Sequence, residues 1–283
     1  MSSPKSPKTT LFSKLSALLS EKKNPVPAQP IPIIVGGCHR SGTTLIRRIL
    51  NAHSRIHCGP EVKFFRDFYN DYLNDPIKHI RYVNSARALL PEPELISILG
   101  QSYIKVQERA AELAGKVRWA DKNPENVLYL DQWQSLLGND WLMVHIIRNP
   151  LDTIASIKDA HFKLSIPPDI ASRVAFYEKY TKAGLKFGKA HPERYFRLQY
   201  ESLVTSPEAT LEKLMTWLGE KLEPQQMEFN EQPQQAGLGD WKVGKTSKVH
   251  SESMGRWAAV LDEEEVAHIR QSTDALWEKI REQ

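Results

Sequence analysis

The sequence has few cysteines and no long apolar run. Its 283 residues include two cysteines, Cys38 and Cys58, which are too few for a disulfide framework. No stretch approaches the roughly 18 apolar residues of a membrane-spanning helix, and residues 1–30 lack the apolar core and cleavage site of a secretion signal. We therefore expect a cytoplasmic protein without a transmembrane segment.

The chain also lacks a strong excess of charge of one sign. Its formal net charge is +4, from 38 lysines and arginines against 34 aspartates and glutamates. Residues 1–30 contain five lysines and one glutamate, so this segment accounts for the whole excess. Because the remainder is neutral, we expect no nucleic-acid partner and only local basic pockets.

Composition divides the chain into a tail and one domain. Residues 1–30 are rich in serine, proline and lysine, which predicts a flexible basic tail. A short amphipathic patch at residues 11–19 could make weak peripheral contact with a membrane or a partner, although a loosely ordered arm fits the composition better. Residues 31–283 are long enough to bury a full core and are predicted to form a single domain.

Hydrophobic patterns predict the main elements of that domain. Apolar, β-rich runs and helical spacing alternate along the chain, and Asp262 with Glu265 forms a helix-start signature. Strands are predicted at residues 31–35, 55–58, 117–121, 141–147 and 195–199, and helices at 171–190, 207–219 and 262–281.

One further absence is more informative, because a phosphate-binding loop lacks its lysine. Residues 37–44 read G-x-x-x-x-G-T-T, whereas a triphosphate-binding loop reads G-x-x-x-x-G-K-[ST]. Thr43 stands where that lysine would be. An apolar run precedes the loop and a helical pattern follows it, so the sequence predicts an anion site at a helix N-terminus. Arg40 and the serine and threonine hydroxyls would add to its backbone N–H groups.

The strand predicted at residues 141–147 ends in an arginine rather than in a carboxylate. Magnesium-dependent phosphoryl transfer needs a carboxylate there as well as the missing lysine. Arg148, with Ser156 on the first turns of the next helix, can instead hold one phosphate from two sides. This pattern indicates a nucleotide donor without a γ-phosphate and without a metal. A structural ion pair of Arg148 at the strand end is the alternative.

The two motifs resemble those of the sulfotransferase family, which uses 3′-phosphoadenosine-5′-phosphosulfate (PAPS). Residues 39–44 are similar to its 5′-phosphosulfate loop, and residues 148–156 to its 3′-phosphate motif, in the expected order. Residues 58–63, 121–124 and 200–203 look most like the tyrosylprotein and bacterial-type branch of the family. The resemblance spans residues 31–260.

This resemblance implies a fold and a reaction. The implied fold class is α/β, a three-layer P-loop nucleotide-binding fold with a central, mainly parallel sheet and a helical acceptor-site insertion at about residues 63–115. PAPS would be the donor and 3′-phosphoadenosine-5′-phosphate (PAP) the product, with no metal. The partner would be a hydroxyl-bearing acceptor, whether a small molecule, a glycan or a peptide. A homodimer is suggested by family analogy alone.

The resemblance also implies roles for individual residues. Glu61 would be the general base that takes the proton of the acceptor hydroxyl, although Pro60 stands where tyrosylprotein members carry a first glutamate. Lys122 and Arg40 would stabilise charge on the departing phosphate. The residues implied to bind the cofactor are His39, Arg40, Ser41, Gly42, Thr43, Thr44, Arg148, Ser156, Tyr200, Lys248, Ser251 and Arg256.

Simpler interpretations stay open for several of these residues. Glu61 could cap the following helix, and Lys122 could be a surface lysine paired with Asp121 or Glu125. Residues 248–257 could be a surface loop leading into a packed helix, and the sequence does not choose between Ser251 and Ser253 as the cofactor ligand.

Two other functions use the same kind of loop. A small-molecule kinase is disfavoured by Thr43 and by the lack of a clear magnesium carboxylate. A non-catalytic nucleotide-binding module would keep the loop without the chemistry of Glu61 and Lys122. The nine histidines show no metal-ligand spacing. The sequence therefore predicts metal-free, in-line transfer of a sulfuryl group from PAPS to an unidentified hydroxyl.

Overall fold

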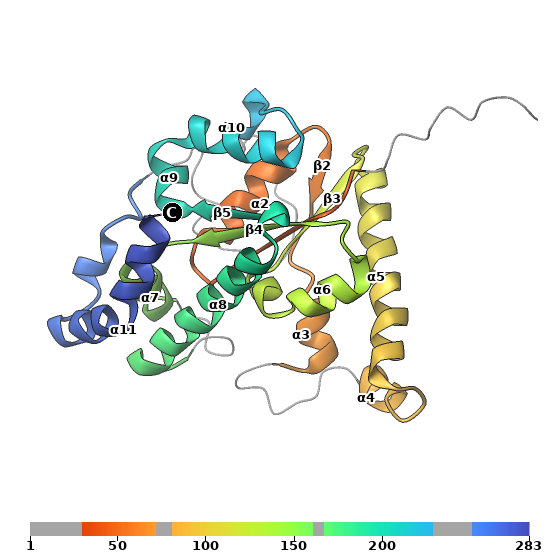
Figure 1. The fold of residues 1–283 in the computed structure, drawn as a ribbon, viewed down its shortest axis with the longest axis horizontal. Coiled ribbons are helices and arrows are strands. Elements are labelled where there is room, and N and C mark those ends of the chain that lie inside the picture. The colour runs from red at the N-terminus through yellow and green to blue at the C-terminus, as the bar shows by residue number, and fades with distance from the viewer. Residues whose placement is uncertain (1–29, 72–80, 161–166, 229–250, 283) are drawn as a thin grey trace, which may run out of the picture. The chain divides into compact units, whose positions relative to one another are not determined.

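A parallel sheet of five strands forms the centre of the protein (Figure 1). The computed structural model describes residues 30–71, 81–160, 167–228 and 251–282. Each neighbouring pair of strands is parallel, in the order β2-β3-β1-β4-β5. The strands are β1 (Ile33–Gly37), β2 (Ile56–Cys58), β3 (Arg118–Lys122), β4 (Leu142–Ile147) and β5 (Tyr195–Gln199).

Successive side chains of β1 enter two separate cores, because a strand alternates its side chains between the two faces of the sheet. Ile33 and Val35 pack with α2, α9 and α10 on one face. Ile34 packs on the other face, in a core that α5, α6, α7, α8 and α11 share. Figure 1 shows α9 and α10 above the sheet and α6 and α8 below it. The predicted three-layer α/β fold is therefore confirmed.

The helices have these bounds: α2 (Thr43–Ala52), α3 (Phe64–Tyr69), α4 (Arg81–Ala86), α5 (Glu92–Leu113), α6 (Leu130–Leu137), α7 (Pro150–Lys158), α8 (Ile170–Ala190), α9 (Tyr200–Thr205), α10 (Pro207–Leu218) and α11 (Glu263–Arg281). All the predicted strands and helices form, with ends that shift by at most two residues. Asp262 and Glu265 make the predicted reciprocal cap, in which each side chain accepts from the backbone N–H of the other. No helix in the described ranges combines the length and apolar composition that a membrane crossing requires.

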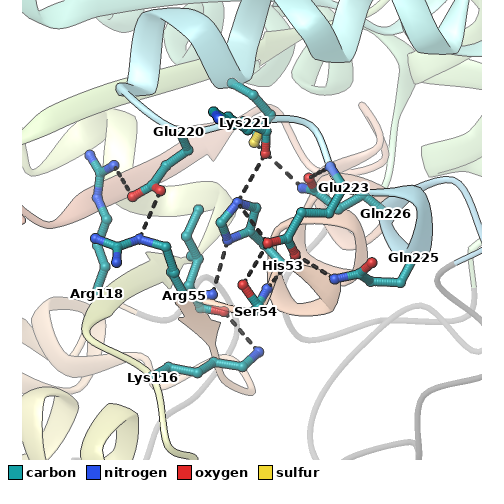
Figure 2. A network of polar contacts seen from close by, with 12 residues as sticks. His53, Ser54, Arg55, Lys116, Arg118, Glu220, Lys221, Glu223, Gln225 and Gln226 are labelled. Atoms are coloured by element: carbon teal, nitrogen blue, oxygen red, sulfur yellow. Dashed lines mark hydrogen bonds and ion pairs between the residues drawn. The ribbon is translucent and has the colours of Figure 1, made fainter.

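A polar network at the amino-terminal ends of β2 and β3 ties the segment after α10 to α2 and β2 (Figure 2). His53 Nδ1 accepts from the Arg55 backbone N–H at 3.0 Å, so Nε2 carries the hydrogen that meets Lys221 O at 3.1 Å. Glu223 accepts from the Ser54 N–H at 2.7 Å and from the Ser54 hydroxyl at 2.5 Å. These bonds hold the chain in place where it leaves α2.

Charged side chains complete the network. Glu220 lies 3.0 Å from Arg55 Nε and 3.4 Å from Arg118 NH1. Arg118 also donates to the carbonyls of Ile31 and Leu218, both at 2.7 Å. Because each buried charge at this edge has partners, the polar starts of β2 and β3 can pack under α10. These contacts fix the sheet at the end where β2 and β3 begin. The opposite end, where the strands finish, carries the loops that follow them.

We predict that Glu223→Gln lowers the free energy of unfolding by about 1 kcal/mol at neutral pH, since it removes charge-assisted bonds at a partly exposed site. Burial opposes ionisation, but the bonds from Ser54, with His53 and Lys116 nearby, lower the pKa of Glu223 below its usual value. The stabilisation is therefore present above the unfolded pKa of roughly 4.3 and is lost as pH falls through the lower folded value.

Urea unfolding at neutral pH and at roughly pH 3 measures this difference. Glu212→Gln, at an exposed position of α10, is the matched control. An equal loss of stability at the two pH values would show that the charge of Glu223 is not the cause.

Candidate functional site

The loop between β1 and α2 presents an uncapped helix N-terminus. Ser41 Oγ donates to Cys38 O at 2.6 Å and to Ile146 O at 3.3 Å, so this hydroxyl braces the loop from within. Gly42 is the N-cap of α2 with φ of 101°, and no side chain caps the helix. Because no side chain caps the first turn of α2, its N-terminus is suited to an anion.

Position 42 requires glycine for two reasons, the contact with the Tyr200 ring and the backbone conformation. A Cβ atom at this position would lie 2.5 Å from Cδ2 of Tyr200, the first residue of α9. That distance is shorter than any tolerable carbon–carbon contact, and the positive φ disfavours a side chain. The loop after β1 is therefore packed directly against the start of the helix after β5.

Arg40, Ser156 and Arg148 meet at the carboxyl ends of β1 and β4. Arg40 has a φ of 69°, in the left-handed region. Its Nε donates to Ser156 Oγ on α7 at 3.1 Å, and its carbonyl accepts from Arg148 NH1 at 3.1 Å. Residues predicted to hold the two ends of one nucleotide are thus in direct contact.

Arg148 is a buried arginine with an unsatisfied donor. It is 6% exposed, its guanidinium lies 4.6 Å from the centre of the Tyr200 ring, and burial lowers its pKa from the usual arginine value. Its described hydrogen bonds go to the carbonyls of Arg40 and Ser253 rather than to a carboxylate, and its Nε is buried without a partner. These contacts favour an anion-binding role over a structural ion pair.

Asn149 sets the direction of α7 from this point. Its side chain accepts from the N–H groups of Leu151 and Asp152, and Pro150 occupies the first helical position, where its missing N–H is not needed. Asp152 in turn accepts from Gly255 N at 2.9 Å and Trp257 N at 3.2 Å. The late segment at residues 251–259 is thereby held against α7.

The residues of that segment that were predicted to bind the cofactor differ in their surroundings. The Ser253 carbonyl contacts Arg148, while Ser251 lies in an exposed turn. Arg256 is half exposed and lies 3.9 Å from Asp159 at the end of α7. Lys248 lies outside the described residues. Cofactor contacts by Ser251, Lys248 and Arg256 stay predictions, as does the reach of the Tyr200 hydroxyl to a phosphate.

Glu61 and Lys122 form a direct ion pair at the carboxyl ends of β2 and β3. Lys122, the last residue of β3, is 1% exposed and donates to Glu61 Oε1. Lys63 Nζ lies 3.5 Å from Glu61 Oε2. The simpler interpretations are therefore wrong, since Lys122 is neither at the surface nor paired with Asp121 or Glu125. Glu61 does not cap α3 either, because that helix begins after Lys63 without a side-chain cap.

Asp121 is a second buried charge at the end of β3. It accepts from Asn123 and Asn126, each at 2.7 Å, from Gln107 at 3.0 Å, and from the Tyr103 hydroxyl. Burial raises the pKa of Asp121, although these donors favour its ionised form. The network binds α5 to β3 and fixes the strand end from which Lys122 projects.

Glu125 is a site residue that the sequence did not reveal, and several charged side chains meet at its carboxylate. Two cations and an imidazole surround its Oε1 atom: Lys63 Nζ lies at 3.0 Å, His39 Nε2 lies at 3.4 Å, and Arg66 NH1 is in direct contact. Burial alone would raise its pKa, but His39, Lys63 and Arg66 lower the pKa of Glu125 well below its usual value. The sequence did contain a signal for Glu125, because the cations within residues 61–66 require an acidic partner if they are buried.

A cavity of about 420 Å³ opens beside Glu125. Phe176 and Tyr180 of α8 line it, and both rings pack against His39 of the phosphate loop, with centroids 5.5 and 5.6 Å away. Arg66 and Lys179 add positive charge to its wall. Within the described part of the predicted insertion at residues 63–115, Arg66 of α3 and the following Asp71 line this cavity, while α5 packs against β3.

Known proteins share sequence with this chain. A family model described as the sulfotransferase family matches residues 32–224. A putative protein-tyrosine sulfotransferase of Caenorhabditis briggsae is 24% identical over 209 residues, which cover 70% of this chain and 69% of that protein. An uncharacterized protein of Aquifex aeolicus is 26% identical over 196 residues, and the match spans 25% of its length.

Two solved structures share the fold. The sulfotransferase domain of the Synechococcus PCC 7002 olefin synthase superposes with a TM-score of 0.59 at 19% identity, covering 86% of this chain and 93% of that one. The sulfotransferase domain from the curacin biosynthetic pathway gives a TM-score of 0.59 at 20% identity, covering 86% and 96%.

We predict that Glu125→Ala lowers the free energy of unfolding by about 3 kcal/mol or more, because it leaves buried cations without their carboxylate. Equilibrium urea unfolding at neutral pH measures the loss. The control is Glu193→Ala, which removes a carboxylate that is 65% exposed and lies 3.4 Å from Arg194. If the two substitutions cost the same, Glu125 does not organise this cluster.

Proposed function

Because the chain belongs to the sulfotransferase family, we propose that it transfers the sulfuryl group of PAPS to a hydroxyl-bearing acceptor. The observation that carries the proposal is the joining of two anion sites by Arg40. Its side chain donates a hydrogen bond to Ser156, and its carbonyl accepts one from Arg148. Its backbone belongs to the loop before α2. A donor with a phosphosulfate at one end and a 3′-phosphate at the other matches such a pair.

The residues present fit the two ends of PAPS. The uncapped N-terminus of α2 offers backbone N–H groups to the 5′-phosphosulfate. Arg148, with its buried and unsatisfied Nε, and Ser156 offer donors to the 3′-phosphate. When bound, PAPS supplies an activated sulfuryl group, and the side chains at the ends of β2 and β3 would act on the acceptor.

Glu61 would take the proton of the acceptor hydroxyl. Its carboxylate faces two ammonium groups, those of Lys122 and Lys63, which would hold it in position beside the acceptor. As the proton passes to Glu61, the acceptor oxygen forms the new bond to sulfur and the phosphate oxygen leaves in line. Lys122 and Arg40 carry positive charge toward that departing oxygen, so the scheme requires no metal.

The cavity beside Glu125 would receive the acceptor. Its wall residue Phe176 packs against His39 of the phosphate loop, and Lys63 connects Glu125 to Glu61. Its aromatic walls fit an acceptor with an apolar or aromatic body. The relative named as a putative protein-tyrosine sulfotransferase makes a tyrosine peptide the first acceptor to test, followed by phenols and sugars.

We predict that Arg148→Ala weakens PAP binding about ten- to a hundredfold, because it removes a charge-assisted phosphate contact. Calorimetric titration with PAP, without added magnesium, measures the affinity of wild type and variant. Arg281→Ala, at an exposed position of α11, is the control and should bind like wild type. Binding of ATP with magnesium, together with no binding of PAP, would refute the proposal and favour a kinase.

We predict that Glu61→Gln reduces turnover about 10²- to 10⁴-fold while PAP affinity stays within roughly threefold of wild type, because a general base acts on the acceptor and not on the nucleotide. Release of PAP from PAPS, with a tyrosine peptide, 4-nitrophenol and a sugar as probe acceptors, measures turnover. Glu212→Gln is the control. Full activity of Glu61→Gln would remove Glu61 from the mechanism.

A further inference from the structure

Strand β2 lies at the edge of the sheet and has β3 as its one neighbouring strand among the described residues. Side chains satisfy part of its remaining backbone. The Asn51 side chain, near the end of α2, accepts from the Cys58 N–H at 3.0 Å. Lys116 Nζ donates to the Ile56 carbonyl at 2.9 Å and also to the Asn51 carbonyl. The edge strand is thus tied to the helix that follows the phosphate loop.

A second side chain of α2 reaches the residue that follows β2. Arg47 NH1 donates to the Gly59 carbonyl at 3.3 Å. Among the described residues Arg47 has no ion-pair partner, and its Nε is buried without an acceptor, so its charge is directed to a backbone carbonyl. Arg47 and Asn51 are four residues apart and therefore project from the same face of α2.

The chain between these two bonds and Glu61 is short and stiff. Pro60 alone separates Gly59 from Glu61, and a proline fixes its own φ at about −65°. On the other side of Glu61, the Val62 carbonyl accepts from Asn123 Nδ2 at 3.0 Å. The backbone that carries Glu61 is therefore held both before and after this residue.

Helix α2 also presents the site proposed for the donor. The phosphosulfate would lie at its N-terminus, and Arg47 and Asn51 follow about one and two turns further along the same helix. Their bonds to residues 58 and 59 thus relate the position of Glu61 to that of the donor. This relation matters because a misplacement of about 1 Å can slow a reaction roughly a hundredfold.

We propose that Arg47 and Asn51 are positioning residues for Glu61. They hold residues 58–60 so that the Glu61 carboxylate stays within reach of an acceptor hydroxyl beside the donor. The inference rests on the proposed function, because it takes Glu61 as the general base. Since both residues act through the backbone before Glu61, their loss should slow turnover without weakening nucleotide binding.

Steady-state kinetics of Arg47→Met and Asn51→Ala test this role. With a tyrosine peptide, 4-nitrophenol and a sugar as probe acceptors, each substitution should lower kcat about ten- to a hundredfold, while PAP affinity stays within roughly threefold of wild type. Arg47→Lys, which keeps a cationic donor, should recover most of the loss. The matched control is Ser54→Ala, which removes a hydrogen bond to Glu223 between α2 and β2 and should turn over like wild type.

A double-mutant cycle separates positioning from general destabilisation. In the Glu61→Gln background, Arg47→Met should cost less than about threefold further, since no base is left to position. Losses that multiply in the double variant overturn the inference. Slow turnover of Glu61→Gln with unchanged turnover of Arg47→Met and Asn51→Ala overturns this inference alone. Wild type that does not bind PAP overturns the proposed function, and this inference with it.

Amide hydrogen exchange measures the bond to β2 without nucleotide or acceptor. The Cys58 N–H should exchange about tenfold faster in Asn51→Ala than in wild type, because the substitution removes its acceptor. Ser54→Ala should leave this rate within roughly twofold of wild type. Equal exchange of the Cys58 N–H in Asn51→Ala and wild type would show that α2 does not hold this segment, and it overturns the inference whatever the acceptor is.

Discussion

The buried ammonium of Lys122 must have a carboxylate beside it, and much of the site follows from that constraint. A lysine that is 1% exposed is tolerated only when paired, and Glu61 is its partner. Glu61 also faces Lys63, which in turn needs Glu125, and Glu125 needs Arg66 and His39. A chain of alternating charges thus runs from the end of β3 to Glu125, which lies beside His39 of the phosphate loop. Each member fixes the next, so the candidate base, the loop and the cavity wall form one electrostatic unit.

The parallel sheet brings this unit together with the anion sites. Carboxyl ends of parallel strands share one edge, and the order β2-β3-β1-β4-β5 places the loop after β1 between the ends of β3 and β4. Lys122 comes from one side and Arg148 from the other. The polar network of His53, Glu220 and Glu223 lies at the opposite edge, where it secures the strand starts without competing for the same charges.

Hydrophobic pattern and turn chemistry were enough to predict the strands, the layers and the Asp262–Glu265 cap, because these depend on local sequence and on burial. The contact of Arg40 with Ser156 was anticipated only in that both residues were assigned to one ligand. Glu125 was missed because the charges at residues 61–66 indicate an acidic partner, whereas only the placement of α3 shows which carboxylate it is. The role of α8 in the cavity was missed for the same reason: Phe176 and Tyr180 look like ordinary core positions until the packing of His39 against them is known.

The contact between Gly42 and Tyr200 links two parts of the chain that are far apart in sequence. The ring of Tyr200 fills the space that a side chain at Gly42 would need, and the same ring lies under the guanidinium of Arg148. Neither position can change alone without disturbing both ends of the anion site. Among related chains, the two positions should therefore vary together, with a residue larger than glycine at the first tolerated only where the second carries a smaller side chain.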